Sequence, residues 1–132
     1  MIVLMPRGHP LTARESVPPQ ALFGETFIGG SNKAGVLRDV TTDYLRRSNI
    51  DIGLDHGVDN IAMAMSLVAS TGGLALMPAY ATDLLPPSVV SRPLEGRPPT
   101  IDVAVGFSDT NTSPVLKLFL SRLGSLNTRP VT

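Results

Sequence analysis

The chain has 132 residues, with 11 basic and 11 acidic side chains, 42% hydrophobic residues, 12 glycines, 12 prolines and no cysteine. A chain of this length buries roughly two-thirds of the surface that its unfolded form exposes, so it can hold one hydrophobic core without disulfides or metal ions. The formal net charge of zero disfavours direct binding to DNA or RNA, which requires a clustered excess of Lys and Arg. The absence of cysteine excludes disulfide frameworks, thiol catalysis and zinc sites with Cys ligands.

The sequence predicts neither secretion nor contact with a membrane. The apolar run at residues 2–5 is much shorter than the core of a signal peptide and has no positive segment before it. The longest weakly polar stretch, residues 68–81, is interrupted by polar residues, two glycines and a proline. It therefore cannot form the ~20-residue apolar helix that a bilayer requires. We expect a cytoplasmic protein.

The first part of the chain predicts short strands joined by a proline-rich loop. Residues 2–5 form a continuous apolar run of the length typical of a buried strand. Paired prolines in residues 16–22 exclude a helix interior but allow one helical turn that ends near Gly24. Residues 26–28 predict a second strand, which ends at residues 29–30.

A helical pattern begins at Ser31. Val36, Val40 and Tyr44 recur at four-residue spacing, and charged side chains occupy the other face. This spacing predicts an amphipathic helix. After it, residues 50–52 predict a brief strand.

A second helix is predicted over residues 60–70, with Asp59 as its N-cap. It is apolar on most sides, which is typical of a helix that lies between other elements. The pair Gly72–Gly73 should end it with a left-handed C-cap, followed by a buried strand over residues 74–77. Further short elements are predicted as a helix over 79–85 and a strand at 89–90.

The C-terminal part predicts one strand and one helix. Apolar residues alternate with Asp, Ala and Gly over residues 101–107, which predicts a half-buried strand. Ser113 as N-cap and Pro114 at the first helical position open a final helix. Strands that alternate with helices predict an α/β domain with a mixed, mostly parallel sheet flanked by helices. The final helix carries one apolar stripe, made of Val115, Leu116, Phe119, Leu120 and Leu123.

The chemistry-bearing side chains predict no catalytic residue, no metal site and no cofactor. His9 has no Gly-x-Ser-x-Gly motif beside it, so we interpret it as a loop histidine. Asp51, Asp55 and Asp59 lack the Asp-x-Asp start and the terminal Glu of a calcium loop. We interpret Asp55 and Asp59 as turn and capping residues and His56 as part of an exposed loop. The glycines before residue 36 lack the spacing of nucleotide-binding loops.

The segment at residues 27–35 is the best candidate for a binding site. It runs from a strand end through two glycines into a helix N-terminus, where free backbone N–H groups and the helix dipole favour a carboxylate or phosphate. Ser31 and Asn32 can add side-chain hydrogen bonds. Alternatively, one of these two residues simply caps the helix.

An ordered series of motifs supplies a family resemblance. Residues 2–6 with His9-Pro10-Leu11, residues 21–28 and residues 67–78 occur in the order of an entry strand, a "Leu, small, Glu, x, Phe, Ile" element and a Val-Ala-Ala-Gly-x-Gly-hydrophobic-x-hydrophobic-Leu-Pro signature. Thr71 lies at or beside the first glycine of that signature. The chain resembles the C-terminal part of the effector-binding domain of LysR-type transcriptional regulators. The series is completed by residues 92–94, the strand to Phe107 and the helix from Ser113.

The resemblance implies a periplasmic-binding-protein-like (type 2) subdomain, the second of two that clamp an effector. It implies that residues 1–107 form this subdomain with hinge strands at 2–6 and 101–107, and that residues 108–132 form a C-terminal helix that returns to the first subdomain. The effector would be a small organic acid or other anion. This favours the ligand interpretation of the binding segment, with contacts from Gly29, Gly30, Ser31, Asn32, Val36 and Leu37.

The sequence lacks the family's winged helix-turn-helix, its linker helix and most of the first effector subdomain. We therefore expect a truncated, non-enzymatic regulator that senses an effector and does not itself bind DNA. One alternative is an interaction module that pairs with full-length regulators. Another is an enzyme on a binding-protein scaffold, for which the sequence offers only isolated acid or base candidates.

The C-terminal part also predicts self-association. In the family its final helix packs on a subdomain that this sequence lacks, so the apolar stripe would be exposed on a single chain. The strand at residues 101–107 would likewise present an unpaired edge. We expect a homo-oligomer formed through the C-terminal strand and helix.

Overall fold

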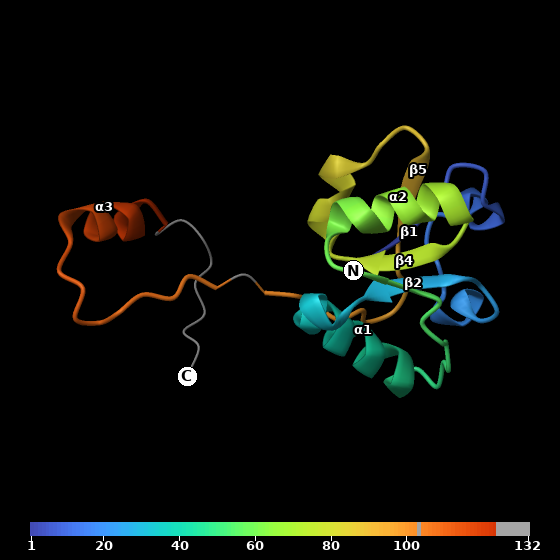
Figure 1. Cartoon of the computed structure of the whole chain (residues 1–132), viewed down its shortest axis with the longest axis horizontal. Helices are drawn as coiled ribbons and strands as arrows, with labels where there is room; N and C mark the ends of the chain where they lie inside the picture. The colour runs from blue at the N-terminus through green and yellow to red at the C-terminus, as the bar shows by residue number, and fades with distance from the viewer. Residues whose placement is uncertain (103, 124–132) are drawn as a thin grey trace. The chain divides into compact units, whose positions relative to one another are not determined.

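Five strands form one mixed sheet in the computed structural model, which describes residues 1–102 and 104–123 (Figure 1). The order across the sheet is β3-β2-β4-β1-β5. Strand β2 is parallel to β3 and β4, whereas β1 is antiparallel to β4 and β5, so four of the five strands run in one direction. The predicted mixed, mostly parallel sheet is confirmed. The strands are β1 (Ile2–Pro6), β2 (Phe27–Gly30), β3 (His56–Val58), β4 (Leu74–Met77) and β5 (Val89–Pro93).

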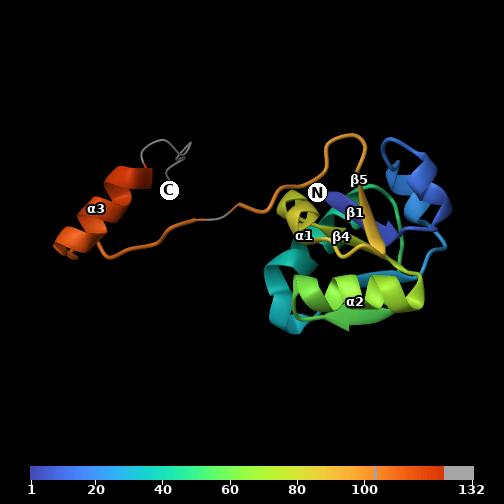
Figure 2. The same cartoon turned by 90° about the horizontal axis from the view of Figure 1, so that it is seen from above.

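Helices α1 (Gly35–Arg47) and α2 (Ile61–Thr71) cover opposite faces of the sheet (Figures 1 and 2). Strand β1 shows why both faces need cover, because successive side chains of a strand point to opposite sides. Ile2 and Leu4 belong to the core cluster that contains α2, whereas Val3 and Met5 belong to the cluster that contains α1. The apolar run of β1 is therefore buried on both faces, as its composition predicted.

Helix α1 starts later than the sequence pattern suggested. Ser31 caps a short 3-10 helix, η3 (Asn32–Ala34), and the α-helix begins only at Gly35. The Ser31 hydroxyl accepts a hydrogen bond from the Lys33 amide at 3.1 Å, which satisfies one of the free donors of the first turn. Ser31 therefore caps η3 and not α1, whose own N-cap Ala34 makes no side-chain hydrogen bond.

Helix α2 is capped by Asn60 and not by Asp59, so the predicted N-cap is wrong by one residue. The Asn60 side chain accepts from the Met63 amide at 2.9 Å, which leaves the carboxylate of Asp59 free for another contact. Gly72 ends the helix in the left-handed conformation with φ of 82°, as predicted. Thr71 stabilises the turn, because its hydroxyl accepts from the Gly73 amide at 3.2 Å.

The strand predicted at residues 50–52 is not formed, and the strand lies instead at His56–Val58. Pairing with β2 begins at Asp55, whose amide donates to the Phe27 carbonyl at 3.0 Å and whose carboxylate accepts from the Phe27 amide at 2.7 Å. The isoleucines at 50 and 52 pack against the α1 side of the core without joining the sheet. His56 is exposed as expected, but it opens β3 and does not belong to a loop.

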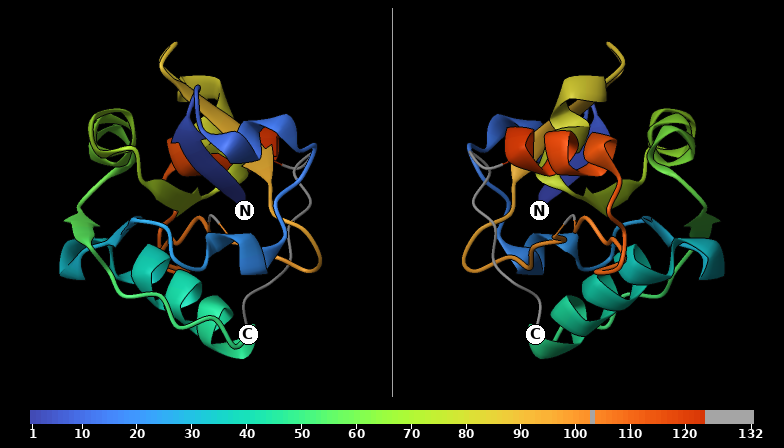
Figure 3. Two further views of the ribbon diagram at one scale, coloured as in Figure 1. Left: turned by 90° about the vertical axis from the view of Figure 1, so that its right-hand side faces the viewer. Right: turned by 90° about the vertical axis from the view of Figure 1, so that its left-hand side faces the viewer.

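Short 3-10 helices connect the strands. The turn predicted after the paired prolines is η2 (Pro19–Leu22), and the predicted helix after Pro78 is η4 (Ala79–Leu84). A further one, η1 (Pro10–Ala13), has His9 as its N-cap. Figure 3 shows η1 and η2 as short blue ribbons and η4 as a short yellow one.

The chain divides into two units, Met1–Asp102 and Val103–Thr132. In the second unit, helix α3 (Pro114–Leu123) begins at the predicted proline. The strand predicted over 101–107 is wrong, because the described residues of this stretch form no strand and Val105 and Phe107 are 51% and 55% exposed. An alternating apolar pattern does not by itself form a strand where no neighbouring strand completes the backbone hydrogen bonds. Within the apolar stripe, Val115 and Phe119 are exposed, whereas the three leucines are half-buried.

Candidate functional site

Two loops meet at one edge of the sheet. Because β2 and β3 are parallel, with Gly30 opposite Val58, the loop after β2 and the loop after β3 leave the sheet side by side. The Ser31 amide donates to the Val58 carbonyl at 2.8 Å, which fixes the two loops to each other. Ligands of open α/β sheets bind outside the carboxyl ends of the strands. The predicted binding segment therefore lies where this fold class places ligands.

Three polar side chains converge at this edge. The Ser31 hydroxyl donates to Oδ1 of Asp59 at 2.5 Å, and the Lys33 ammonium lies 3.1 Å from Oδ2 of the same carboxylate. The Ser31 hydrogen bond, with a further contribution from Lys33, holds the pKa of Asp59 below its ordinary value. Asp59 is thus ionised at neutral pH, and the sequence analysis missed this role. No local signal marks this role, because its partner Ser31 lies 28 residues earlier in the chain.

Asn32 is engaged on the other side of the same loop. Its side-chain oxygen accepts a hydrogen bond from the guanidinium of Arg38, one turn into α1. Both side chains are exposed. This contact ties the start of η3 to α1 and occupies one of the two polar side chains expected to meet a ligand.

Both glycines that end β2 are closely packed, Gly30 against backbone and Gly29 against the tip of the exposed Leu54 side chain. A Cβ added to Gly29 would lie 2.7 Å from Cδ1 of Leu54, and one added to Gly30 would lie 3.0 Å from the carbonyl of Ala34. Both distances are shorter than carbon contacts normally allow. Their small size lets η3 and the segment before β3 close over the end of β2.

The predicted site residues border two separate hollows. Gly29 and Gly30 line a cavity of about 620 Å³ between β2, α1 and residues 49–54. Val36 and Leu37 line a smaller hollow of about 270 Å³ at the start of α1. Ser31 and Asn32 line neither of them. The other residues around the smaller hollow are Lys33, Ala34, Gly35, Ile61, Pro78, Tyr80 and Ile101.

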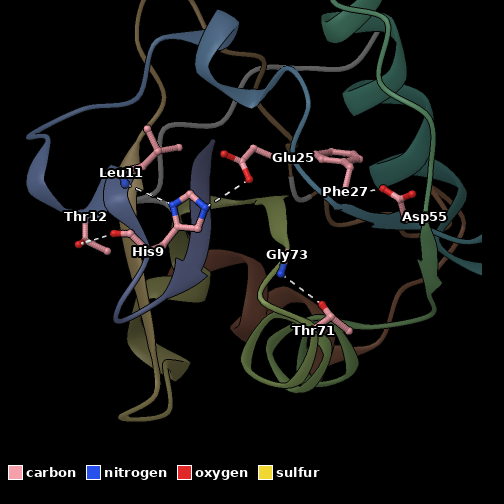
Figure 4. A network of polar contacts seen from close by, with 8 residues as sticks. All are labelled: His9, Leu11, Thr12, Glu25, Phe27, Asp55, Thr71 and Gly73. Atoms are coloured by element: carbon pink, nitrogen blue, oxygen red, sulfur yellow. Dashed lines mark hydrogen bonds and ion pairs between the residues drawn. The ribbon is translucent and has the colours of Figure 1, made fainter.

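Two other polar residues singled out in the sequence, His9 and Asp55, have structural contacts. Figure 4 shows His9 between two partners: Nδ1 accepts from the Leu11 amide at 3.2 Å, and Nε2 lies 3.4 Å from Oε2 of Glu25. In the same view Asp55 binds the backbone of Phe27. His9 therefore caps η1, and Asp55 fixes the start of β3.

Metal-binding clusters and membrane-spanning helices are both absent from residues 1–102 and 104–123. These residues contain no group of three or more His, Cys, Asp or Glu side chains placed to hold a metal ion. None of the helices described there is long and apolar enough to cross a membrane.

Comparison with known proteins agrees with the fold. Residues 1–126 match the family described as the LysR substrate binding domain. The chain is 25% identical to the Hca operon transcriptional activator HcaR of Escherichia coli strain K12 over 122 aligned residues. The aligned region covers 92% of this chain and 41% of HcaR. The chain therefore spans less than half the length of this curated relative.

Solved structures show the same architecture. The CcmR regulatory domain of Synechocystis PCC6803 in complex with 2-PG superposes with a TM-score of 0.73 and 17% identity, over 92% of this chain and 60% of that one. The effector binding domain of QuiR in complex with shikimate gives a TM-score of 0.70 and 18% identity, over 91% of this chain and 57% of that one. Both are similar to this chain in fold.

Proposed function

Because this chain belongs to the LysR substrate-binding domain family, we propose that it is an effector-sensing module that binds a small organic anion at the loops after β2 and β3. One observation supports the proposal most directly. The loops after β2 and β3 lie side by side, next to a hollow that is lined by Lys33 and the first turn of α1. The Lys33 ammonium has donors beyond its contact with Asp59, and these suit a carboxylate or phosphate.

The smaller hollow supplies the apolar part of such a site. Val36, Leu37, Ile61 and Tyr80 line it together with Lys33. Small-molecule sites typically combine an apolar lining with a few polar groups that fix orientation. Shikimate, the compound bound to the related QuiR domain, is itself a small carboxylic acid. This supports the same chemical class of ligand for this chain.

In this proposal the sheet unit is the second of two subdomains that close on the effector. A ligand that touches both subdomains binds the closed clamp more tightly than the open one, and this difference in affinity shifts the population. The output of the chain is then a change of conformation and not a chemical step. We place this non-enzymatic function in the cytoplasm, where the DNA of a regulated gene is found.

Helix α3 favours self-association as a second property. Val115, Leu118 and Phe119 are exposed apolar side chains on a short helix. Exposed apolar patches mark contact surfaces more often than isolated apolar residues do. We include in the proposal that this helix pairs with a second copy of the chain.

The test of the effector site is an NMR titration of the isotope-labelled chain with shikimate and benzoate. We expect saturable shifts of the backbone amides from Gly29 to Leu37, with little change at residues 89–93 of the opposite sheet edge. The variant Val36→Trp, which fills the smaller hollow, should abolish these shifts while the remaining spectrum stays folded. Unmoved amides at saturating acid would show that the segment is only a helix cap.

A further inference from the structure

An ionised carboxylate already occupies the proposed anion site. Asp59 accepts from the Ser31 hydroxyl and pairs with the Lys33 ammonium, as described above. Its side chain is 38% exposed and that of Lys33 is 81% exposed, so both groups are reached from solvent. The two charges cancel, so the local excess of positive charge that an anion prefers is absent.

A simple carboxylic acid meets a disadvantage here. To reach Lys33 it must share the ammonium with Asp59, and two carboxylates within a few ångströms repel each other. The guanidinium of Arg38, the next cation along the segment, donates to Asn32. A ligand that carries only a carboxylate therefore gains little from the polar side chains of this edge.

An acid with a neighbouring donor meets no such disadvantage. The Lys33 ammonium has three donors, so it can hold a ligand carboxylate while it keeps its contact with Asp59. The Asp59 carboxylate has lone pairs beyond those used by Ser31 and Lys33, and it can accept from a ligand hydroxyl or ammonium. Adjacent opposite charges in the protein thus match adjacent donor and acid groups in the ligand.

From these contacts we propose that Asp59 makes the site selective for 2-hydroxy and 2-amino acids with an apolar side chain. The proposal rests on the proposed function, because it assumes that the effector occupies the hollow beside Lys33. The apolar lining by Val36, Leu37, Ile61 and Tyr80 then holds the body of the acid. Asp59 does not line this hollow, but its Oδ2 lies 3.1 Å from the ammonium of Lys33, which does, so in this proposal Asp59 contacts the part of the ligand that Lys33 holds.

The test compares three acids that share one ring: phenylacetate, mandelate and 2-phenylglycine. Dissociation constants are measured by NMR titration for the unmodified chain and for Asp59→Asn. In the unmodified chain, mandelate and 2-phenylglycine should bind about fivefold more tightly than phenylacetate, the size of effect typical of an exposed charge contact. In Asp59→Asn, phenylacetate should gain and 2-phenylglycine should lose affinity, so that the order is reversed.

A matched control separates this effect from general charge removal. Glu95 also accepts from a serine hydroxyl, that of Ser16 at 2.8 Å, but it follows β5 at the opposite edge of the sheet. Glu95→Gln should keep the affinity order of the unmodified chain. An unchanged order in Asp59→Asn, with shifts still at Gly29 to Leu37, would overturn the selectivity and leave the effector site intact. The absence of binding by all three acids to both proteins would overturn the site and the selectivity together.

Discussion

The sheet unit and the C-terminal segment each contain a stretch whose apolar residues predict a strand, with opposite results. Residues of β1 are buried on both faces of the sheet, whereas the alternating residues 105 and 107 are about half exposed and form no strand. Both stretches were predicted as strands from the sequence. Strand β1 has β4 and β5 on its two sides, and the second stretch has no such neighbour among the described residues. A strand pattern therefore predicts a strand only where the fold supplies a partner.

The largest expected difference between the two regions comes from core truncation. Leu4→Ala removes a fully buried side chain of β1, so it should lower the free energy of unfolding by about 2–5 kcal/mol. Val105→Ala removes an exposed side chain and should change it by less than about 0.5 kcal/mol. Urea denaturation followed by circular dichroism measures both. Equal losses would mean that the C-terminal segment shares the core.

A glycine pair gives the next largest contrast. A Cβ on Gly73 would lie 2.9 Å from the Thr26 carbonyl oxygen, which is backbone and yields little. Gly73→Ala should therefore cost about 1–3 kcal/mol of stability. Gly106, in the C-terminal segment, has nothing within 4 Å of such a Cβ, so Gly106→Ala should be close to neutral. The midpoints of urea denaturation should separate the two variants, and coinciding midpoints would contradict the packing argument.

A smaller effect follows from the lowered pKa of Asp59. The folded pKa lies below the ordinary value of 3.8, so the contact contributes stability at pH values above that value. This stability is lost as the pH falls through the folded pKa. The melting temperature of the unmodified chain should exceed that of Asp59→Asn at pH 7, and the difference should shrink below the ordinary Asp pKa.

Ser31 supplies the control for this pH effect, because its hydrogen bond is the main cause of the lowered pKa. In a Ser31→Ala background, Asp59→Asn should change the pH profile less than it does in the unmodified chain. If the difference in melting temperature between the unmodified chain and Asp59→Asn stays constant down to pH 2, the charge of Asp59 does not contribute to stability.

The smallest expected effect on folding stability comes from α3. Phe119→Asp places a charge on an exposed position, so the urea midpoint of the sheet unit should not move. If α3 pairs with a second copy, the same substitution should reduce the sedimentation coefficient at micromolar concentration. A chain that already sediments as a monomer, unchanged by Phe119→Asp, would contradict self-association through this helix.

Local patterns predicted most of the sheet unit and less of the site. The apolar run of β1, the Gly72 cap and the periodicity of α1 are local features, and they give the strands and helices nearly in place. The position of β3 depends on the contact of Asp55 with Phe27, 28 residues earlier, which no local pattern contains. The same non-local pairing brings Asp59 to Ser31. The acidic member of the site could therefore be found only after β3 was placed correctly.

The place of β1 in the sheet has a consequence for how the chain folds. This strand is formed by residues 2–6, yet it lies between β4 and β5 and pairs Ile2 with Met77 and with Pro93. During synthesis, some 90 further residues must be made after β1 before its second partner, β5, is available for pairing. Such long-range pairing slows folding and leaves unpaired, apolar strands exposed to aggregation. Because β5 is synthesised so much later than β1, the apolar residues 2–5 need protection until the sheet can close.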